Sequence, residues 1–397
     1  MIYECPNCVA ALIYNPTTGK MDCLGCGSSF DVDQFEEKEK KAETAQAARE
    51  QNTQNFGILE DDMMECNIYS CTACGAELAV NGVESSTFCA YCGQPTIVFN
   101  RVSSTKKPKY IIPFSISKDQ AITSIRNRLS SGAFVPVEIQ HFEIERVRGI
   151  YVPFWLYDID YSDEQYLSGK VKSGKSTVTK YYFRSAKTTF HNLTLDASQQ
   201  LSDESSQRLE PYNTQNITTF DTGYLSGFYA DCFDMSSEQL KSLAIKRSMQ
   251  MFNAQIEKSV KASDVKIIRN NPKINVTKAE YAMFPAWFLT FRYNDDPYTI
   301  LVNGQTGKVV GAVPVNNKKA TATFWLIGVI ASFILTFVAY ALLQIDDEDI
   351  QEFIVYGCIG GGFMWYSGIN TLKKVKKSIE LSKSSRMNHF VKDRQEG

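Results

Sequence analysis

The longest hydrophobic stretch of the chain lies near its C-terminus. Residues 324–343 are twenty residues without a charge, and Ser332 and Thr336 are their only small hydroxyl side chains. As a helix rising about 1.5 Å per residue, they would extend roughly 30 Å, the thickness of a bilayer's hydrocarbon core. A second stretch, residues 353–369, has 17 uncharged residues. The pattern predicts a transmembrane helical hairpin over residues 320–371, and the alternative for the second stretch is a re-entrant or interfacial helix.

Charged residues around these two stretches predict the orientation of the hairpin. The basic flanks are Lys318, Lys319, Lys373, Lys374, Lys376 and Lys377. The turn between the stretches, residues 346–349, is entirely acidic. Since basic flanks stay on the cytoplasmic side, we expect a multi-pass protein of the cell membrane with both termini in the cytoplasm. The basic tail, residues 372–397, either lies on anionic lipid or only sets this orientation. The N-terminal residues have no basic region and no apolar run, so we expect no signal peptide.

Eight of the eleven cysteines form four C-x-x-C pairs. The pairs are Cys5 and Cys8, Cys23 and Cys26, Cys71 and Cys74, and Cys89 and Cys92. Fourteen residues separate the pairs of each set, and the second set repeats the first with an offset of 66. A tight C-x-x-C turn aims two thiolates at one ion, and two such turns complete a tetrahedral sulfur site. The spacing predicts two tandem zinc ribbons with four cysteine ligands each, residues 1–32 and 66–100.

Four sulfurs would close the coordination sphere of each ion and leave no position for a catalytic water. We therefore expect two structural Zn²⁺ ions per chain, with a rubredoxin-type iron site as the alternative. Metal-binding cysteines are expected in a reducing compartment, which agrees with the cytoplasmic placement. Cys66 has no partner at metal-ligand spacing, and we interpret it as a spare thiol at the edge of the ribbon.

The charge of the N-terminal region indicates which class of partner it binds. Residues 1–100 contain five Lys or Arg and fifteen Asp or Glu. Binding to nucleic acid needs cations that displace counterions from phosphates, so we expect the ribbons to bind a protein and not DNA or RNA. Residues 33–65, between the ribbons, are rich in Glu, Lys and Ala at first. Their composition predicts an exposed helical spacer followed by a linker.

Residues 106–316 contain helix and strand patterns in an order that recurs, which predicts an α+β domain. Residues 117–120 and 236–239 both match a capping box, and they open predicted helices that reach about Leu129 and Val260. Strand-like runs follow each helix, at residues 142–147, 150–159, 265–268 and 281–291. Polar residues 162–215 predict solvent-facing strands and long loops. A hairpin is predicted for residues 298–313.

A short motif also recurs in this domain. Pro153-x-Trp155 matches Pro285-x-Trp287. The match indicates a duplicated unit, although the spacing between helix and motif differs in the two copies, so a single unrepeated domain stays the alternative. Because proline lacks a backbone N–H, we expect both prolines to mark an edge strand or a bulge.

No catalytic constellation is present in the sequence. The three histidines, His141, His191 and His389, are far apart, and there is no nucleotide-binding or nucleophile-elbow motif. Cys232 has acidic and aromatic neighbours, and a small buried residue is a better interpretation than a nucleophile. We expect a protein that is not an enzyme.

Taken together, two four-cysteine ribbons, P-x-W strands, the hairpin around residues 303–311 and the glycine-rich stretch 357–362 are an unusual set. The chain resembles bacterial, mainly Gram-positive, membrane-tethered zinc-ribbon proteins, often labelled TFIIB-type zinc ribbon, over most of its length. Some members are similar to membrane components of phage-shock-type envelope-stress systems. The resemblance implies an adaptor that brings a cytoplasmic flotillin-like or phage-shock-type protein to the membrane, and other membrane proteins as further partners.

The sequence thus predicts an α+β multidomain protein that acts as a membrane-anchored zinc-ribbon adaptor. The alternative is a membrane-tethered nucleic-acid-binding or transcription-related protein. A third hypothesis, a redox enzyme that uses the C-x-x-C pairs, requires free dithiols in place of metal.

Overall fold

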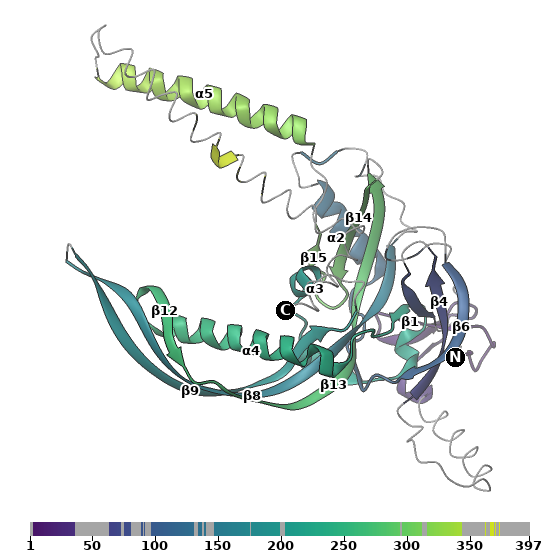
Figure 1. The fold of residues 1–397 in the computed structure, drawn as a ribbon. Helices are drawn as coiled ribbons and strands as arrows, with labels where there is room; N and C mark the ends of the chain where they lie inside the picture. The colour runs from purple at the N-terminus through teal and green to yellow at the C-terminus, as the bar shows by residue number, and fades with distance from the viewer. Residues whose placement is uncertain are drawn as a thin grey trace.

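In the computed structural model, the chain forms a small N-terminal sheet, a body with a large sheet and a long C-terminal helix (Figure 1). It describes residues 3–35, 63–72, 75–80, 97–130, 147–174, 176–198, 203–293, 296–311 and 316–343, and a few positions around 89–91, 134–139 and 362–373. The spacer residues 36–62 and the tail beyond residue 373 lie outside the described residues.

The N-terminal sheet has three antiparallel strands in the order β1-β2-β3. They are β1 (Leu12–Asn15), β2 (Lys20–Cys23) and β3 (Ser29–Phe30). A single bridge between Glu4 and Ala11 closes the chain before β1 onto this sheet. Side chains of β1 alternate in burial: Leu12 and Tyr14 are buried, whereas Ile13 and Asn15 are partly exposed.

The body contains a mixed twelve-stranded sheet with the order β10-β7-β13-β8-β11-β5-β4-β6 along its main path. The strands are β4 (Met63–Cys71), β5 (Glu77–Val80), β6 (Ile97–Lys106), β7 (Tyr110–Ile111), β8 (Val147–Ser173), β9 (Ser176–Asp196), β10 (Thr218–Thr219), β11 (Tyr229–Asp231), β12 (Ser263–Asn270), β13 (Lys273–Tyr293), β14 (Asp296–Asn303) and β15 (Val309–Val310). Parallel pairs β11–β8 and β13–β7 stand among antiparallel ones. The interval between the predicted second ribbon, residues 66–100, and the predicted α+β domain, residues 106–316, is part of strand β6.

The helices confirm both predicted capping boxes. They are α2 (Lys118–Ser130), α3 (Asp203–Leu209), α4 (Ser237–Ser259) and α5 (Asn317–Leu343), with 3₁₀ turns η4 (Thr214–Asn216) and η5 (Thr222–Leu225). Ser236 and Gln239 exchange side-chain and backbone hydrogen bonds at the start of α4, and Ser117 and Gln120 do so at α2. α3 lies in a segment for which the sequence predicts strands and loops.

β8 and β9 form a long hairpin that extends away from the rest of the body with β12 and α4 (Figure 1). We call residues 158–190 of this hairpin, together with β12 and α4, the arm. α4 covers one face of the arm: the rings of Tyr161 and Phe252 lie 4.3 Å apart between centroids, and Gln165 Nε2 donates to Asn253 Oδ1 over 2.7 Å. Side chains that alternate with Tyr161 and Gln165 therefore point away from α4.

Two parts of the body make matching contacts. Trp155 Nε1 donates to the carbonyl of Met235, and Trp287 Nε1 donates to the carbonyl of Ile116, each over 2.9 Å. Each acceptor immediately precedes the serine that caps α4 or α2. The two motif tryptophans therefore hold the two capped helices in the same way, in agreement with the repeat seen in the sequence.

The prediction that Pro153 and Pro285 mark edge strands or bulges is wrong. They lie inside β8 and β13, which pair with each other and each have another neighbour. On its other side, β8 pairs with β11 up to Tyr151 and with β9 from Phe154, so Pro153 falls in the gap. Pro285 falls in the same kind of gap between β7 and β14. No ladder bond is required from the proline nitrogen there, so the central strands tolerate it.

α5 contains the first predicted hydrophobic stretch as one continuous helix. Within the described part of the chain, no helix is long and apolar enough to cross a membrane. The second stretch, residues 353–369, lies mostly outside the described residues.

Candidate metal centre

The first cysteine set lies on two tight turns of the N-terminal sheet. The N–H of Val9 donates to the carbonyl of Cys5 over 2.8 Å, and the N–H of Gly27 donates to that of Cys23 over 3.0 Å. Val9 and Gly27 both have positive φ, 66° and 74°. This turn reverses the chain within five residues, so the two sulfurs of each C-x-x-C pair share one side.

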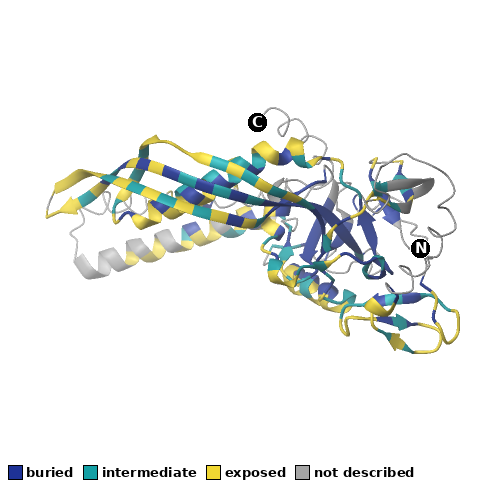
Figure 2. Ribbon diagram, turned by 90° about the horizontal axis from the view of Figure 1, so that it is seen from below, coloured by how far each residue is buried: buried dark blue, intermediate teal, exposed yellow. Residues whose placement is uncertain are grey.

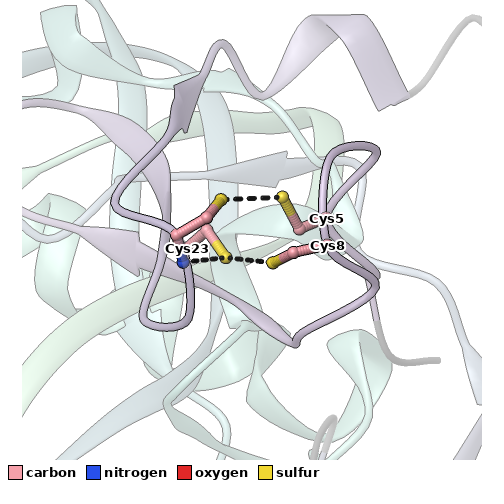
Figure 3. A group of neighbouring side chains, drawn as sticks. Cys5, Cys8 and Cys23 are labelled. Carbon is pink, nitrogen blue, oxygen red and sulfur yellow. Dashed lines mark hydrogen bonds between the residues drawn. The ribbon is translucent and has the colours of Figure 1, made fainter.

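The four sulfurs of these turns form one group (Figure 3). Cys5 Sγ lies 3.5 Å from Cys26 Sγ, and Cys8 Sγ lies 3.4 Å from Cys23 Sγ. All four sulfurs lie within 4.8 Å of one another. A tetrahedral zinc ion with Zn–S bonds of about 2.3 Å holds its sulfurs about 3.8 Å apart, so the group could hold a zinc ion after small shifts.

Polar groups contact several of the sulfurs, and at Cys23 and Cys26 they favour the thiolate form that binds metal. The backbone N–H of Asn7 points at Cys5 Sγ (3.4 Å), and that of Cys26 points at Cys23 Sγ (3.5 Å). Asn7 Nδ2 donates to Ser28 Oγ over 2.9 Å, and Ser28 Oγ lies 3.2 Å from Cys26 Sγ. Hydrogen bonding from the Ser28 hydroxyl, and then from its backbone N–H, lowers the pKa of the Cys26 thiol to about 6.

The first ribbon is fixed to the body by backbone contacts of β1. The N–H of Tyr14 donates to the carbonyl of Ser226 over 3.1 Å, and the Ser226 hydroxyl donates to the carbonyl of Leu12. Gly227 has a φ of +84°, and a Cβ there would lie 2.5 Å from Ile13 Cγ2. Only glycine allows this close approach, so the ribbon docks as part of one hydrophobic core with the body.

The second cysteine set is described only in part. Cys71 and Cys89 are buried, whereas Cys74 and Cys92 lie outside the described residues. The turn after Cys71 repeats that of the first set, because the N–H of Gly75 donates to the Cys71 carbonyl over 2.8 Å and its φ is 75°. Among the described residues, all four cysteines of the first set come together in one group. A metal site at the second set stays a prediction.

A buried polar cluster ties the second set to the body. The hydroxyls of Tyr91, which lies within the last C-x-x-C pair, and of Ser198 both donate to Asp231 Oδ2 over 2.6 Å. Thr290 Oγ1 donates to the Tyr91 carbonyl over 3.1 Å. Burial raises the pKa of Asp231 to about 7, although the bonds from Ser198 and Tyr91 favour the ionised carboxylate.

The sequence pattern did not single out Asn7, Ser28 and Asp231. The first two had a signal, since they are polar residues within and just after C-x-x-C pairs. Asp231 had none, because its partner Tyr91 lies 140 residues away. No catalytic arrangement forms in the described part: His191 is exposed beside Asp158, with 3.8 Å between Nδ1 and Oδ1, and Cys232 is half-buried. The other two histidines and the side chain of Cys66 are not described.

Comparison with known proteins finds a relative over almost the full length. The chain is 26% identical over 372 residues to the uncharacterized protein YdjG of Bacillus subtilis strain 168, and the alignment covers 91% of this chain and 99% of that protein. The chain is thus a distant homologue of YdjG. No family model and no solved structure matches it. A ribbon motif alone is too short to account for an alignment of this length.

Proposed function

We propose that the chain is a membrane-anchored cytoplasmic adaptor that brings a partner protein to the membrane. The supporting observation is the surface of α5. Seven of its large apolar side chains are exposed, namely Trp325, Leu326, Ile327, Ile330, Phe333, Ile334 and Phe337. Phe333 and Phe337 are 73% and 72% exposed. Such a surface is unfavourable in water and favourable in lipid.

The charges of the sequence supply the orientation of this anchor. Uncharged residues 324–343 and 353–369, an acidic turn between them and lysines outside them fit a hairpin with both termini in the cytoplasm. The ribbons and the α+β body precede the anchor and would remain in the cytoplasm. The closed sulfur group of the first ribbon suits a structural zinc ion, and we propose a second ion at the second set.

The partner is proposed from charge and from the family resemblance. Fifteen acidic and five basic residues in residues 1–100 suit a partner with a basic surface and a contact that salt weakens. A flotillin-like or phage-shock-type protein is the candidate that the resemblance implies. We propose no enzymatic activity. The alternative, a tethered nucleic-acid-binding protein, predicts a salt-dependent gel shift with DNA that the acidic ribbons do not favour.

The topology is tested by labelling whole cells with an impermeant thiol reagent. A cysteine in the acidic turn, Asp347→Cys, should gain label, and one in the tail, Asn388→Cys, should not. The unchanged chain, with its eleven native cysteines, supplies the background. New label at both positions, or none at Asp347→Cys, would overturn the hairpin.

The adaptor role is tested by separating the anchor from the body. A chain that ends at Asn316 should stay soluble, bind zinc and keep its partner, yet leave the partner away from the membrane. Residues 317–397 alone should reach the membrane and recruit nothing from the cytoplasm. Imaging a labelled partner with each half distinguishes these outcomes, and recruitment by the anchor alone would place the docking surface in the membrane helices.

A further inference from the structure

The distal half of the arm is strongly basic. Between Glu164 and Asp196 the chain has six Lys or Arg and no Asp or Glu. Residues 258–273, which include the end of α4 and β12, have five Lys or Arg and one Asp. The two segments carry a balance of +10 in a chain whose total is −2.

Aromatic side chains lie on the face of the arm that α4 leaves open. Tyr166 alternates with Gln165, which bonds to α4, so Tyr166 points away from that helix. It stands opposite Phe183 of β9, with ring centroids 5.0 Å apart. Tyr166, Phe183 and Tyr181 are 52%, 49% and 76% exposed. Figure 2 views the arm from this side and shows exposed residues becoming more frequent toward its tip.

Lysines and aliphatic side chains accompany these rings. Lys170 shares the alternation of Tyr166 along β8, and Lys266 stands opposite Ser168, on the same face. An exposed ion pair with Asp264 (2.7 Å) offsets the charge of Lys170. Ile268 is exposed nearby on β12. The arm therefore presents cations, tyrosines and aliphatic groups together.

We infer that the arm rests on the anionic lipid headgroups of the membrane that carries the anchor. Tyrosines concentrate at the membrane interface, lysines attract anionic headgroups, and exposed aliphatic groups gain by entering the acyl boundary. The inference builds on the proposed membrane anchor, because a tethered arm meets the surface at high effective concentration.

Single-stranded nucleic acid is the competing ligand for such a surface. It would stack its bases on the exposed rings, and it would favour arginine among the cations. Nine of the eleven cations in these segments are lysines. The aliphatic Ile268 has no role in base stacking. Both observations favour lipid.

Hydrogen exchange of the full chain in nanodiscs tests the inference. Discs of phosphatidylcholine alone are compared with discs that also contain phosphatidylglycerol. Backbone amides of residues 166–183 should exchange more slowly in the anionic discs only. Lys172→Glu with Lys266→Glu, two exposed positions on the face of Tyr166, should abolish this difference. Each lysine contributes about fivefold in affinity, converted from about 1 kcal/mol near an anionic surface. Lys241→Glu with Lys246→Glu, an equal charge change on exposed positions of α4, should preserve it.

Three results would overturn the inference: equal exchange in both kinds of disc, protection that survives reversal of Lys172 and Lys266, or protection by a single-stranded oligonucleotide in neutral discs without any effect of anionic lipid. If the proposed membrane anchor itself is wrong, the result is distinguishable, because the chain would not enter neutral discs. In that case flotation of the chain with anionic and neutral vesicles decides the question for the arm. Binding to anionic vesicles alone supports it, and binding to neither refutes it.

Discussion

The two cysteine sets share one spacing but have different surroundings. The first set lies on a separate three-stranded sheet, docked through β1 onto the segment around Ser226. The strands next to the second set, β4 and β5, belong to the large sheet, where β5 pairs with β11. Cys71 and Cys89 are buried in the same cluster as Phe154 and Phe284.

This difference indicates that an identical ligand pattern can serve two structural roles. A metal in the first set would hold together a sheet too small to fold alone. A metal in the second set would stabilise one end of the large sheet. The hydrogen bond between Tyr91 and Asp231 also stabilises that end. Substitutions in the first set should therefore affect the small N-terminal sheet, whereas substitutions in the second set should affect the large sheet.

The largest effect is expected from removing a predicted zinc site. Cys71→Ser with Cys74→Ser should remove one of two ions and destabilise the large sheet, whereas Cys5→Ser with Cys8→Ser should unfold the N-terminal sheet only. A structural zinc site contributes on the order of 10 kcal/mol. Metal analysis and hydrogen exchange over β8 measure both outcomes. Loss of both ions from either variant, or equal hydrogen exchange over β8 in the two variants, would contradict the proposed difference between the two cysteine sets.

The next effect concerns Asp231, which belongs to the second set alone. Its pKa rises from 3.8 to about 7 in the folded protein, so the folded state holds a proton that the unfolded state releases. The free energy of unfolding should fall by up to about 4 kcal/mol as pH rises from about 4 to about 7.

Asp231→Asn should flatten this dependence and raise stability above pH 7 relative to the parent. Denaturant unfolding of the chain ending at Asn316 measures it, and the difference between the two proteins cancels the pH dependence of zinc release. Asp264→Asn, at an exposed position, is the control and should retain the fall. A parallel pH dependence in Asp231→Asn and its parent would contradict the assignment.

A smaller effect is expected at Ser28, which serves the first set alone. Ser28→Ala removes the hydroxyl beside Cys26 Sγ and should weaken zinc binding there by about 10- to 100-fold, as loss of such supporting groups does. Competition with a chelator measures the affinity. Ser29→Ala, whose hydroxyl instead donates to Asp22, should bind zinc like the parent. Equal weakening in both variants would point to a general loss of stability.

The smallest effect compares equivalent turn positions of the two sets. Val9 adopts φ 66° in the first set, where the second has Gly75 at φ 75°. Because a β-branched residue is strained there, Val9→Gly should stabilise its turn by about 1 kcal/mol and Gly75→Val should destabilise the other by a similar amount. Nothing lies within 4 Å of a Cβ at Gly75, so the cost is backbone strain. Thermal unfolding of both variants should show a higher melting temperature for Val9→Gly and a lower one for Gly75→Val than for the parent.

Local chemistry in the sequence determined the features that depend on neighbouring residues. The C-x-x-C spacing predicted the first sulfur group, because each turn is built within five residues. Ser236 with Gln239 predicted the start of α4, and the turn after Asn303 predicted the β14–β15 hairpin. In each case the groups that stabilise the structure lie close together in the chain.

Only the tertiary structure decided the features that join distant segments. The gap beside Pro153 exists because β11 and β9, far apart in sequence, end and begin there. Tyr91 meets Asp231 only through the pairing of β5 with β11. The open face of the arm is defined by α4, which covers the opposite face. Such contacts depend on strand order and on which face is covered, and neither property is encoded in the local pattern of hydrophobic and polar residues.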